Sequence, residues 1–511
     1  MKRRFTTPTH VGNITIGGGA PIRVQSMNTT NTNDTEACVA QAKRIISAGG
    51  ELVRLTTQGS REAENMKNIS AALKAEGIMT PLVADVHFNA NVADIAAKYC
   101  EKVRVNPGNY VDPARTFKKL EYTDEEYQAE LKRIEERFVP FLNICKEHHT
   151  AVRIGVNHGS LSDRIMSRYG DTPEGIVESC MEFLRICKRE NFNDVVLSIK
   201  ASNTVVMVTS VRLLVKAMDQ EDMHYPLHLG VTEAGEGEDG RIKSAVGIGA
   251  LLSEGIGDTI RVSLSEEPEN EIPVAKKLIA TPTPLPLPKG RGESADEEAD
   301  IQSTPLSPSV PPHTVTRWIA DDVLYVALNE DDADDVKLYA AMWAGAPLID
   351  GKAHELVIYN KGEIFDSSVK SEVMMTKPTD SQSVTSPSPW GGAGEGVSES
   401  ILQAARVRFT KTEYISCPGC GRTLYDLQGT IARIKAAVSK AAETNPRFKT
   451  LKIGIMGCIV NGPGEMADAD YGYVGAGPNK ISLYKGKECV EKNIPEAEAV
   501  QKLLDFIEKD I

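Results

Sequence analysis

The residues best suited to chemistry lie in two short loops near the C-terminal end of the chain. The first loop is Ser416-Cys417-Pro418-Gly419-Cys420-Gly421, and the second runs from Gly457 to Glu465 with Cys458 near its start. A Cys-x-x-Cys turn can direct two thiolates at one soft metal centre, and glycine and proline let the backbone wrap closely around a bulky group. Cys458 follows the apolar run Leu451–Met456, so a predicted strand would deliver the third thiolate.

Three kinds of site could use these thiolates. Structural zinc normally takes four protein ligands from cysteine and histidine. All nine histidines lie at or before His354, so the C-terminal region offers no imidazole. Iron in an iron–sulfur cluster can also accept an oxygen ligand, and Glu465 provides one in the same loop as Cys458. The spacing favours an iron–sulfur cluster and leaves zinc or a thiol-redox pair as alternatives.

Composition restricts the class of protein. A chain of 511 residues is too long for one compact core, so two or three domains are expected. The formal net charge of −13 and the 5% aromatic content argue against general nucleic-acid binding. No apolar run is long enough for a signal peptide or a membrane span, which predicts a cytoplasmic protein. The cysteines from Cys38 to Cys187 are scattered and are expected to be ordinary free thiols.

Short apolar runs alternate with amphipathic stretches from about residue 20 to about residue 265. Eight such repeats predict a (β/α)8 barrel. A doubly wound sheet is the alternative, but no G-x-G-x-x-G follows the first run. The expected strands are 22–27, 52–56, 82–88, 102–106, 152–157, 195–200, 227–233 and 259–263.

Six of these runs carry a cation flanked by apolar residues. A charge in a short apolar strand is costly unless it is paired or solvated, so six at similar places suggest a cationic ring at the barrel mouth. Guanidinium groups fit phosphate oxygens, which indicates an anion site; structural ion pairs are the alternative. The cations are Arg23, Arg54, Arg104, Arg153, Lys200 and Arg261. Polar residues near the strand ends fit the same interpretation: Asp85, His87, Asn106, Asn157, Glu233 and Ser263.

The two cysteine loops resemble the iron–sulfur domain of the IspG/GcpE family, the 4-hydroxy-3-methylbut-2-enyl diphosphate synthases. The matching motifs are Cys-Pro-Gly-Cys-Gly-Arg and Gly-Cys-Ile-Val-Asn-Gly-Pro-Gly-Glu. The family holds a [4Fe-4S] cluster with three cysteines and one glutamate. The resemblance therefore implies Cys417, Cys420, Cys458 and Glu465 as the ligands in this chain.

The barrel resembles the same family from Val11 to about residue 280. The matching motifs include Ala-Asp-Val-His-Phe, Arg-Val-Asn-Pro-Gly-Asn and Leu-His-Leu-Gly-Val-Thr-Glu-Ala-Gly. Strand alternation adds Arg261, which shares a face with Ser263. The resemblance, with this addition, implies substrate contacts at Arg54, Asp85, His87, Arg104, Asn106, Arg153, Asn157, Lys200, Arg261 and Ser263. Glu233 is the expected proton donor, and Glu465 is expected to serve catalysis as an exchangeable ligand.

The composition predicts three parts: a barrel over 1–280, an insertion over 281–400 and a cluster domain over 401–511. Residues 281–313 and 379–399 are rich in proline, serine and glycine, as in flexible linkers. The segment 315–377 between them has enough apolar residues for a small α/β module. The cluster domain is expected to be α+β, with strands near 451–456, 472–475 and 481–484 and helices over 425–444 and 496–509.

The resemblance implies an iron–sulfur oxidoreductase of isoprenoid precursor biosynthesis. It would convert 2-C-methyl-D-erythritol 2,4-cyclodiphosphate into (E)-4-hydroxy-3-methylbut-2-enyl diphosphate by reductive dehydration. Ferredoxin or flavodoxin would donate the electrons, because the chain has no flavin or nicotinamide fingerprint. A homodimer is expected. The alternatives are a metal-free phosphate-binding barrel transferase with a structural zinc lobe, and an electron carrier with a degenerate barrel.

Overall fold

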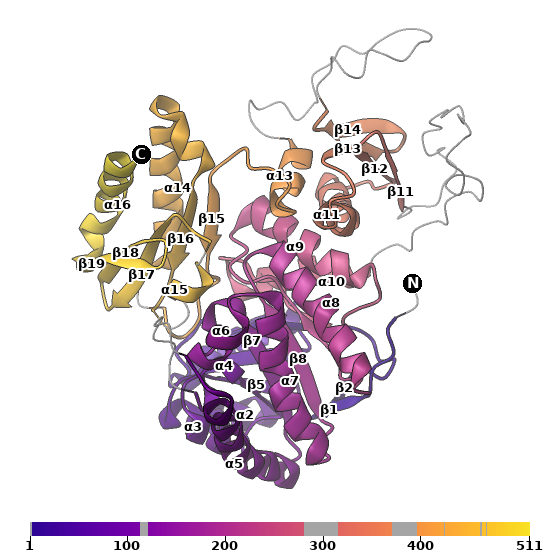
Figure 1. Ribbon diagram of the computed structural model, residues 1–511, viewed down its shortest axis with the longest axis vertical. Coiled ribbons are helices and arrows are strands. Elements are labelled where there is room, and N and C mark those ends of the chain that lie inside the picture. Colours follow the sequence, from indigo (N-terminus) through magenta and orange to yellow (C-terminus); the bar gives the residue numbers. More distant parts are fainter. Residues whose placement is uncertain are drawn as a thin grey trace.

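The computed structural model describes residues 3–112, 121–280, 315–369 and 396–511, except residues 424, 460, 461 and 467. A barrel, a small α/β module and a C-terminal lobe are packed together (Figure 1). The expected linkers, 281–313 and most of 379–399, lie outside the described residues. No described helix is both long and apolar enough to cross a membrane.

Eight parallel strands form the barrel in the order β8-β7-β6-β5-β4-β3-β10-β9. A parallel bridge between Leu197 and Leu227 joins the two ends of this sheet. The sheet therefore closes, which confirms the predicted barrel and excludes the doubly wound alternative. The strands are β3 (Arg23–Met27), β4 (Leu52–Thr57), β5 (Leu82–Val86), β6 (Lys102–Val105), β7 (Ala151–Asn157), β8 (Val195–Lys200), β9 (His228–Leu229) and β10 (Thr259–Ile260).

Helices follow the strands and cover the barrel from outside (Figure 1). Local sequence fixes where they begin: Asp34 accepts a hydrogen bond from the Ala37 amide, and Thr172 caps a helix that starts with Pro173. The helices are α1 (Thr35–Ser47), α2 (Ser60–Ala75), α3 (Ala90–Ala96), α4 (Pro107–Tyr110), α5 (Asp124–His148), α6 (Asp163–Tyr169), α7 (Pro173–Arg189), α8 (Thr204–Gln220), α9 (Gly237–Leu252) and α10 (Glu271–Ile279). Short 3₁₀ turns lie at His158–Ser160 and Pro268–Asn270.

A hairpin of β1 (Thr9–Val11) and β2 (Ile14–Ile16) closes the barrel floor. The sequence pattern does not indicate this hairpin, because each strand has only three residues. Val11 and Ile16 form an apolar cluster with four residues at the starts of barrel strands: Leu52, Val83, Ala151 and Val196. Successive inward side chains are two residues apart along a strand, so the next layer above this floor holds Arg54, Asp85, Arg153 and Ser198. The floor therefore directs the charged layer towards the open end.

The module inserted after α10 is a four-stranded sheet with one helix. Its order is β11-β12-β13-β14, with β11 (Val315–Ala320), β12 (Val323–Leu328), β13 (Glu355–Asn360) and β14 (Glu363–Ser367). Helix α11 (Ala333–Ile349) joins β12 to β13, and Asp332 caps its start. This helix packs on α9 of the barrel, as does α13 (Val397–Ala404). The expected boundary at residue 400 lies within α13.

The C-terminal lobe is a five-stranded sheet in sequence order with helices against it. The α+β prediction is confirmed, although two of the strands, β15 and β19, were not expected. The strands are β15 (Glu413–Ser416), β16 (Lys452–Met456), β17 (Tyr471–Gly477), β18 (Lys480–Lys485) and β19 (Glu488–Pro495). The helices are α14 (Leu427–Thr444), α15 (Gly462–Glu465) and α16 (Glu496–Asp510), with a 3₁₀ turn at Pro446–Thr450.

We predict that Gly345→Ala loosens the module from the barrel. A β-carbon at Gly345 would overlap the backbone carbonyl of Val246 on α9, so the helices would have to separate. Overpacking of this kind costs on the order of 1–3 kcal/mol. Thermal unfolding should show the loss, and hydrogen exchange should speed up in α9 and α11. Gly477→Ala is the control, because a β-carbon there meets no atom within 4 Å. Unchanged exchange in both helices would contradict this packing.

Candidate active site

The barrel mouth and the C-terminal lobe enclose a cavity of about 90 Å³. It lies at the carboxyl ends of the strands, where the barrel fold places its active sites. The barrel contributes Met27, Arg54, Asp85, His87, Arg104, Arg153, Asn157, Lys200, Thr232, Glu233, Arg261 and Ser263 to its wall. The lobe contributes Cys417, Pro418, Gly419, Cys420, Arg422, Met456, Gly457, Cys458 and Gly462.

Five of the six strand cations meet in this cavity: Arg54, Arg104, Arg153, Lys200 and Arg261. Arg23 does not, because it begins β3 at the other end of the barrel and forms an ion pair with Glu51 at 2.6 Å. Including Arg23 in the cationic ring was therefore wrong. Lys102 is a further buried cation that was not among the expected site residues, and its inward direction follows from alternation with Arg104.

Asp85 lies at the centre of the cations and carries their counter-charge. Its Oδ1 lies 3.0 Å from Arg104 Nη1, and its Oδ2 lies 3.8 Å from Arg54 Nε. Burial would raise the pKa of this carboxyl, but Arg54 and Arg104 outweigh burial and hold the pKa well below its ordinary value. Burial lowers the pKa of Arg54 to about 10, so Arg54 stays charged near neutral pH. Asp85 is therefore an ionised fixed charge.

His87 also contacts this group. Its Nε2 lies 3.6 Å from Asp85 Oδ2 and 2.5 Å from Arg104 Nη1. Burial and the Arg104 charge lower the pKa of His87 to about 3, so the imidazole is neutral near pH 7. A neutral His87 can accept a hydrogen bond from Arg104, but it adds no charge to the site.

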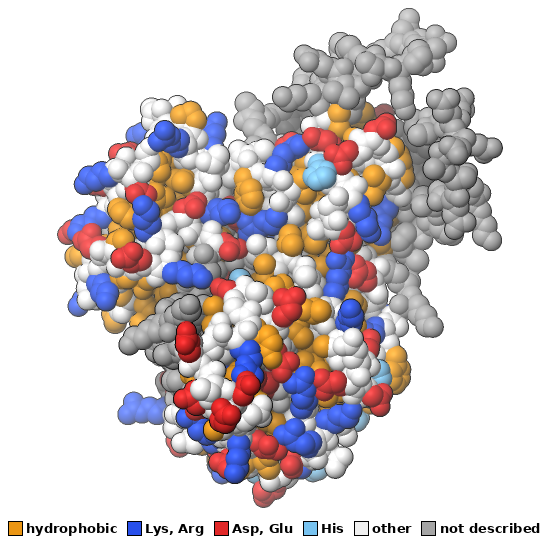
Figure 2. All heavy atoms as spheres, in the orientation of Figure 1, with side chains coloured by type: hydrophobic (Ala, Val, Ile, Leu, Met, Phe, Trp, Pro, Cys, Tyr) orange, Lys and Arg blue, Asp and Glu red, His pale blue; other side chains and the backbone are white. Residues whose placement is uncertain are grey.

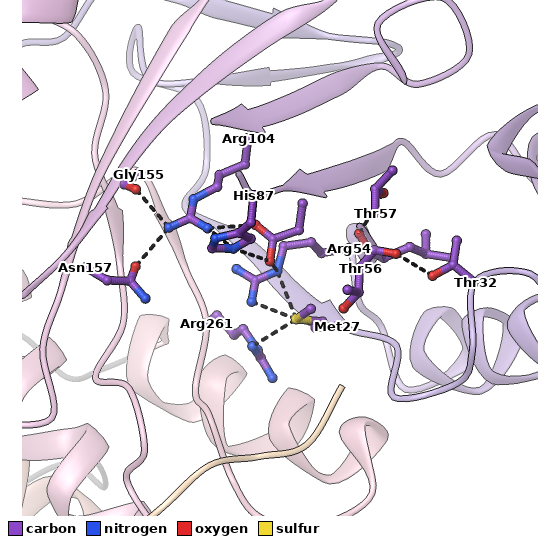
Figure 3. Close-up of polar contacts among 12 residues, drawn as sticks. Met27, Thr32, Arg54, Thr56, Thr57, His87, Arg104, Gly155, Asn157 and Arg261 are labelled. Carbon is purple, nitrogen blue, oxygen red and sulfur yellow. Dashed lines mark hydrogen bonds and ion pairs between the residues drawn. The ribbon is translucent and has the colours of Figure 1, made fainter. Parts of the chain in front are cut away.

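Backbone and neutral groups hold the guanidinium groups in place (Figure 3). Arg104 Nη2 donates to Gly155 O at 2.8 Å and to Asn157 Oδ1 at 2.9 Å. A β-carbon at Gly155 would lie 2.6 Å from Arg104 Nε, so only glycine leaves room for this side chain. Met27 Sδ lies between Arg54 and Arg261, at 2.7 Å from Arg54 Nη2.

The positive charge of the cavity exceeds the negative charge. Arg261 is paired with Glu271 at 2.9 Å, whereas Arg153 is almost fully buried and its Nε and Nη1 have no hydrogen-bond partner among the described residues. Burial, with Arg54 and Arg153 nearby, holds the pKa of Lys200 well below its ordinary value. Unpaired buried cations are costly, so the arrangement suits an anion with several oxygens.

Asn106 lies outside the cavity wall. Its side chain caps α4 by accepting from the Gly108 amide at 3.2 Å, and its Nδ2 donates to Ser160 Oγ at 2.8 Å. Asn106 therefore fixes the loops after β6 and β7. By contrast, Thr232 and Arg422 line the cavity but were not selected from the sequence. The alternation His228, Gly230, Thr232 could have identified Thr232, and Arg422 ends the Cys-Pro-Gly-Cys-Gly-Arg motif.

Three of the C-terminal cysteines border the cavity. Cys417 and Cys420 follow β15, and Cys458 follows β16. The Gly457 amide donates to Cys417 Sγ at 3.2 Å, a contact of the kind that tunes sulfur ligands of iron. The fourth C-terminal cysteine, Cys489, lies on β19 at the sheet edge and outside the cavity wall. Thiols around a shared cavity fit a cluster.

The donor geometry does not support a single zinc ion. Among the described residues, no three side chains of His, Cys, Asp or Glu converge closely enough to hold one metal ion. Structural zinc needs four such donors around one centre. A cluster has several metal atoms, so its ligands are spread around a larger group.

Glu465 lies at the seam between lobe and barrel. Its Oε1 accepts from Asn157 Nδ2 at 2.6 Å, and its Oε2 accepts from Thr232 Oγ1 at 3.0 Å. Burial raises the pKa of both Glu465 and the neighbouring Glu233, and their mutual repulsion raises that of Glu465 further. The pair therefore holds a proton more readily than ordinary carboxyl groups do. The structure does not bring Glu465 into the cavity wall with the cysteines.

The lobe closes on the barrel of its own chain. Ala234 and Ser416 form a parallel bridge, and Lys243 binds Glu413 at 2.8 Å. A β-carbon at Gly159 would overlap the backbone of Gly464, so these two glycines allow direct backbone contact. The described residues that line the cavity therefore come from the barrel and the lobe of the same chain.

Family models match most of the chain. Residues 6–276 match the GcpE TIM-barrel domain, and residues 413–509 match the GcpE protein C-terminal domain. The chain belongs to the GcpE family. The two matched regions together contain the residues that line the cavity: the first covers the barrel and the second covers the lobe. The inserted module lies between the two matched regions.

Curated GcpE relatives match over nearly their full length. The relative from Bacteroides thetaiotaomicron is 50% identical over 99% of this chain and 98% of its own, and is named 4-hydroxy-3-methylbut-2-en-1-yl diphosphate synthase (flavodoxin). Relatives from Porphyromonas gingivalis and Akkermansia muciniphila share this name at 44% and 41% identity, over 98% and 96% of their lengths. Dihydropteroate synthase from Xanthomonas albilineans matches 54% of this chain at 14% identity with a TM-score of 0.35, which is too low to support an argument.

We predict that Glu413→Gln weakens the contact between lobe and barrel. Glu413 is bound by Lys243 and Arg406; burial raises its pKa, but these cations outweigh burial and lower the pKa to about 2. Removing one partner of a buried pair costs on the order of 3 kcal/mol. Urea unfolding at about pH 7 should show the loss.

The pH dependence gives a second check on Glu413. Because the folded pKa lies below the ordinary 4.5, the ion pair stabilises the protein above about pH 4.5, and this contribution is lost as the pH falls towards 2. The difference between wild type and variant should therefore be smaller at about pH 3 than at about pH 7. Glu491→Gln, which removes an exposed pair with Lys502, is the control and should have little effect. A difference that is independent of pH would contradict the assignment.

Proposed function

We propose that this chain is a 4-hydroxy-3-methylbut-2-enyl diphosphate synthase of isoprenoid precursor biosynthesis. It would take 2-C-methyl-D-erythritol 2,4-cyclodiphosphate and release (E)-4-hydroxy-3-methylbut-2-enyl diphosphate. The observation that carries this proposal is one cavity with an excess of buried cations on the barrel side and three cysteine side chains on the lobe side. A polyanionic substrate and a redox centre would meet there. The conversion consumes two electrons and one proton, opens the ring at a carbon–oxygen bond and releases water.

The barrel cations would bind the diphosphate. Arg54, Arg104, Arg153, Lys200 and Arg261 are held in place before the substrate arrives, so their orientation costs little on binding. Neutralising the phosphate oxygens in a closed site makes the diphosphate oxygen a better leaving group. His87 and Asn157 would orient Arg104, and Ser263 offers a hydroxyl at the same wall.

Cys417, Cys420 and Cys458 would hold a [4Fe-4S] cluster, with Glu465 as its fourth ligand. The bound cluster would supply electrons one at a time next to the substrate. To reach the cluster, the Glu465 carboxylate would exchange its contacts with Asn157 and Thr232. Gly462 and Gly464, on either side of Pro463, give the loop room to do so.

Glu233 would supply the proton. It lies in the cavity wall with a positive φ of 48°, a strained conformation of the kind found at functional sites. Burial keeps its pKa above the ordinary value, so the carboxyl can be protonated near neutral pH. Loss of the hydroxyl as water needs such an acid.

The curated relatives carry flavodoxin in their names, so a flavodoxin is the expected electron donor, with ferredoxin as the alternative. The reaction would take place in the cytoplasm. A homodimer stays a prediction, although the residues around the cavity come from one chain.

Arg104→Ala should lower kcat/KM strongly. Arg104 is buried and bonds Asp85, Gly155 and Asn157, so its removal disorders the anion site as well as deleting a cation. The expected loss is on the order of 2–5 kcal/mol, measured with the cyclodiphosphate and a chemical reductant. Arg23→Ala is the matched control, since this strand arginine lies outside the cavity. If both variants keep wild-type kinetics, the diphosphate assignment fails.

Glu465→Gln should weaken cluster retention or change the electronic spectrum, whereas Cys489→Ser should leave both cluster and activity nearly intact. The reason is position: Glu465 belongs to the Cys458 loop at the seam, and Cys489 lies on an edge strand. Iron content and visible absorption after anaerobic purification measure both effects. The opposite pattern, with loss of the cluster in Cys489→Ser alone, would overturn the oxygen-ligand assignment.

A further inference from the structure

Arg422 is a cation that the lobe brings to the barrel mouth. It lies two residues after Cys420, is 8% exposed and lines the same cavity as the strand arginines. The other five cations of the cavity all come from the barrel: four lie in strands, and Arg261 directly follows β10. Arg422 is therefore the only arginine or lysine in the described cavity wall whose position depends on closure of the lobe.

The Arg422 guanidinium is not satisfied by the protein alone. In the part of the chain that the structure describes, its Nε and Nη1 are buried and have no hydrogen-bond partner, although the side chain also bonds Cys420. Arg422 also lies close to the charged groups of the barrel. Burial and the Arg104 charge lower the pKa of His87 most, and the Arg422 charge lowers it further. Buried donors of this kind are costly unless a ligand accepts from them. A phosphate oxygen is such an acceptor, and the planar guanidinium fits it.

The Arg422 loop is held against the barrel by a tight backbone contact. A β-carbon at Gly421 would lie 2.7 Å from the carbonyl oxygen of Thr30, which belongs to the loop between β3 and α1. Within the lobe, Thr423 Oγ1 accepts from the Cys420 amide at 3.1 Å and fixes the turn. Closure of the lobe therefore sets where the Arg422 side chain lies.

We propose that Arg422 is a substrate-binding residue, which the lobe carries to the barrel mouth so that diphosphate binding and lobe closure favour each other. This inference rests on the proposed function, because it takes the cyclodiphosphate as the anion. An anion bound to both lobe and barrel holds them together, and it binds the closed form more tightly than the open one. Barrel cations alone would bind substrate without favouring closure.

The test uses the cluster-loaded protein in the oxidised state without reductant, so that substrate binds but does not react. Titration calorimetry with the cyclodiphosphate should give a Kd for Arg422→Gln raised by roughly 30-fold. Hydrogen exchange should slow at residues 29–31 when substrate binds to wild type, and this slowing should be lost in the variant. Arg433→Gln is the matched control, because Arg433 is a half-exposed arginine on α14 of the same lobe.

The electronic spectrum of the substrate-free protein tests the alternative role of Arg422, which is to bond the Cys420 sulfur. If Arg422 serves only the Cys420 sulfur, Arg422→Gln will change the electronic spectrum of the substrate-free protein and leave the Kd unchanged, which overturns the proposal. If Arg422→Gln loses iron, Arg422→Lys is the variant to measure. Lysine keeps the positive charge but lacks the paired N–H donors of the guanidinium group, so the Kd should still rise by about 10-fold. A wild-type Kd in Arg422→Lys would then overturn the proposal.

Binding of inorganic pyrophosphate tests the role of Arg422 independently of the proposed substrate. If wild type binds pyrophosphate but not the cyclodiphosphate, the proposed substrate is wrong. The role of Arg422 is then measured with pyrophosphate, where the same rise in Kd is expected. Equal pyrophosphate affinity in wild type and Arg422→Gln would overturn the inference by itself.

Discussion

The structure depends on keeping several positive charges inside a closed barrel mouth. Asp85 is the counter-charge at their centre, and it neutralises only part of the charge of Arg54 and Arg104. Such a group is stable only where rigid neighbours fix each cation and an anion can complete the balance. The apolar floor under the charged layer and the hairpin that seals it keep these cations directed at the opening. The same buried cations therefore repel one another in the free protein and provide the binding energy for an anion.

The site is divided between two bodies, so its assembly depends on how closely they approach. Three of the contacts across the seam are between backbones: the bridge from Ala234 to Ser416, the pair Gly159 and Gly464, and Gly421 against Thr30. Contacts between backbones cannot be relaxed by a change of side-chain rotamer, so they fix one position of the lobe on the barrel. Figure 2 shows acidic and basic side chains interspersed over the outer face, in contrast to the excess of positive charge in the cavity.

Helix α9 connects the inserted module to this seam. One part of the helix packs on α11 at Gly249 and Gly345, whereas its first turns present acidic and basic side chains to the lobe. Asp239 binds Lys411, and Lys243 binds Glu413. Arg408 adds a second connection, since it binds Glu355 of the module and Glu399 of α13 just before the lobe begins. The described part of the module therefore supports the lobe through α9 and Arg408 and contributes no residue to the cavity wall.

The sequence by itself determined the parts of this protein whose information is local. Apolar periodicity gave the eight strands and their helices, and the strand cations indicated an anion site, because inward direction follows from alternation along each strand. The thiols were recognisable from their spacing. Only the tertiary structure decided that Arg23 lies at the wrong end of its strand, that Asn106 caps a helix, and that Glu465 bonds Asn157 and Thr232. It also decided that the lobe closes on its own barrel. The reason is physical: these facts depend on distances in space between residues that are far apart in the chain. The pattern of residues along the chain does not determine those distances.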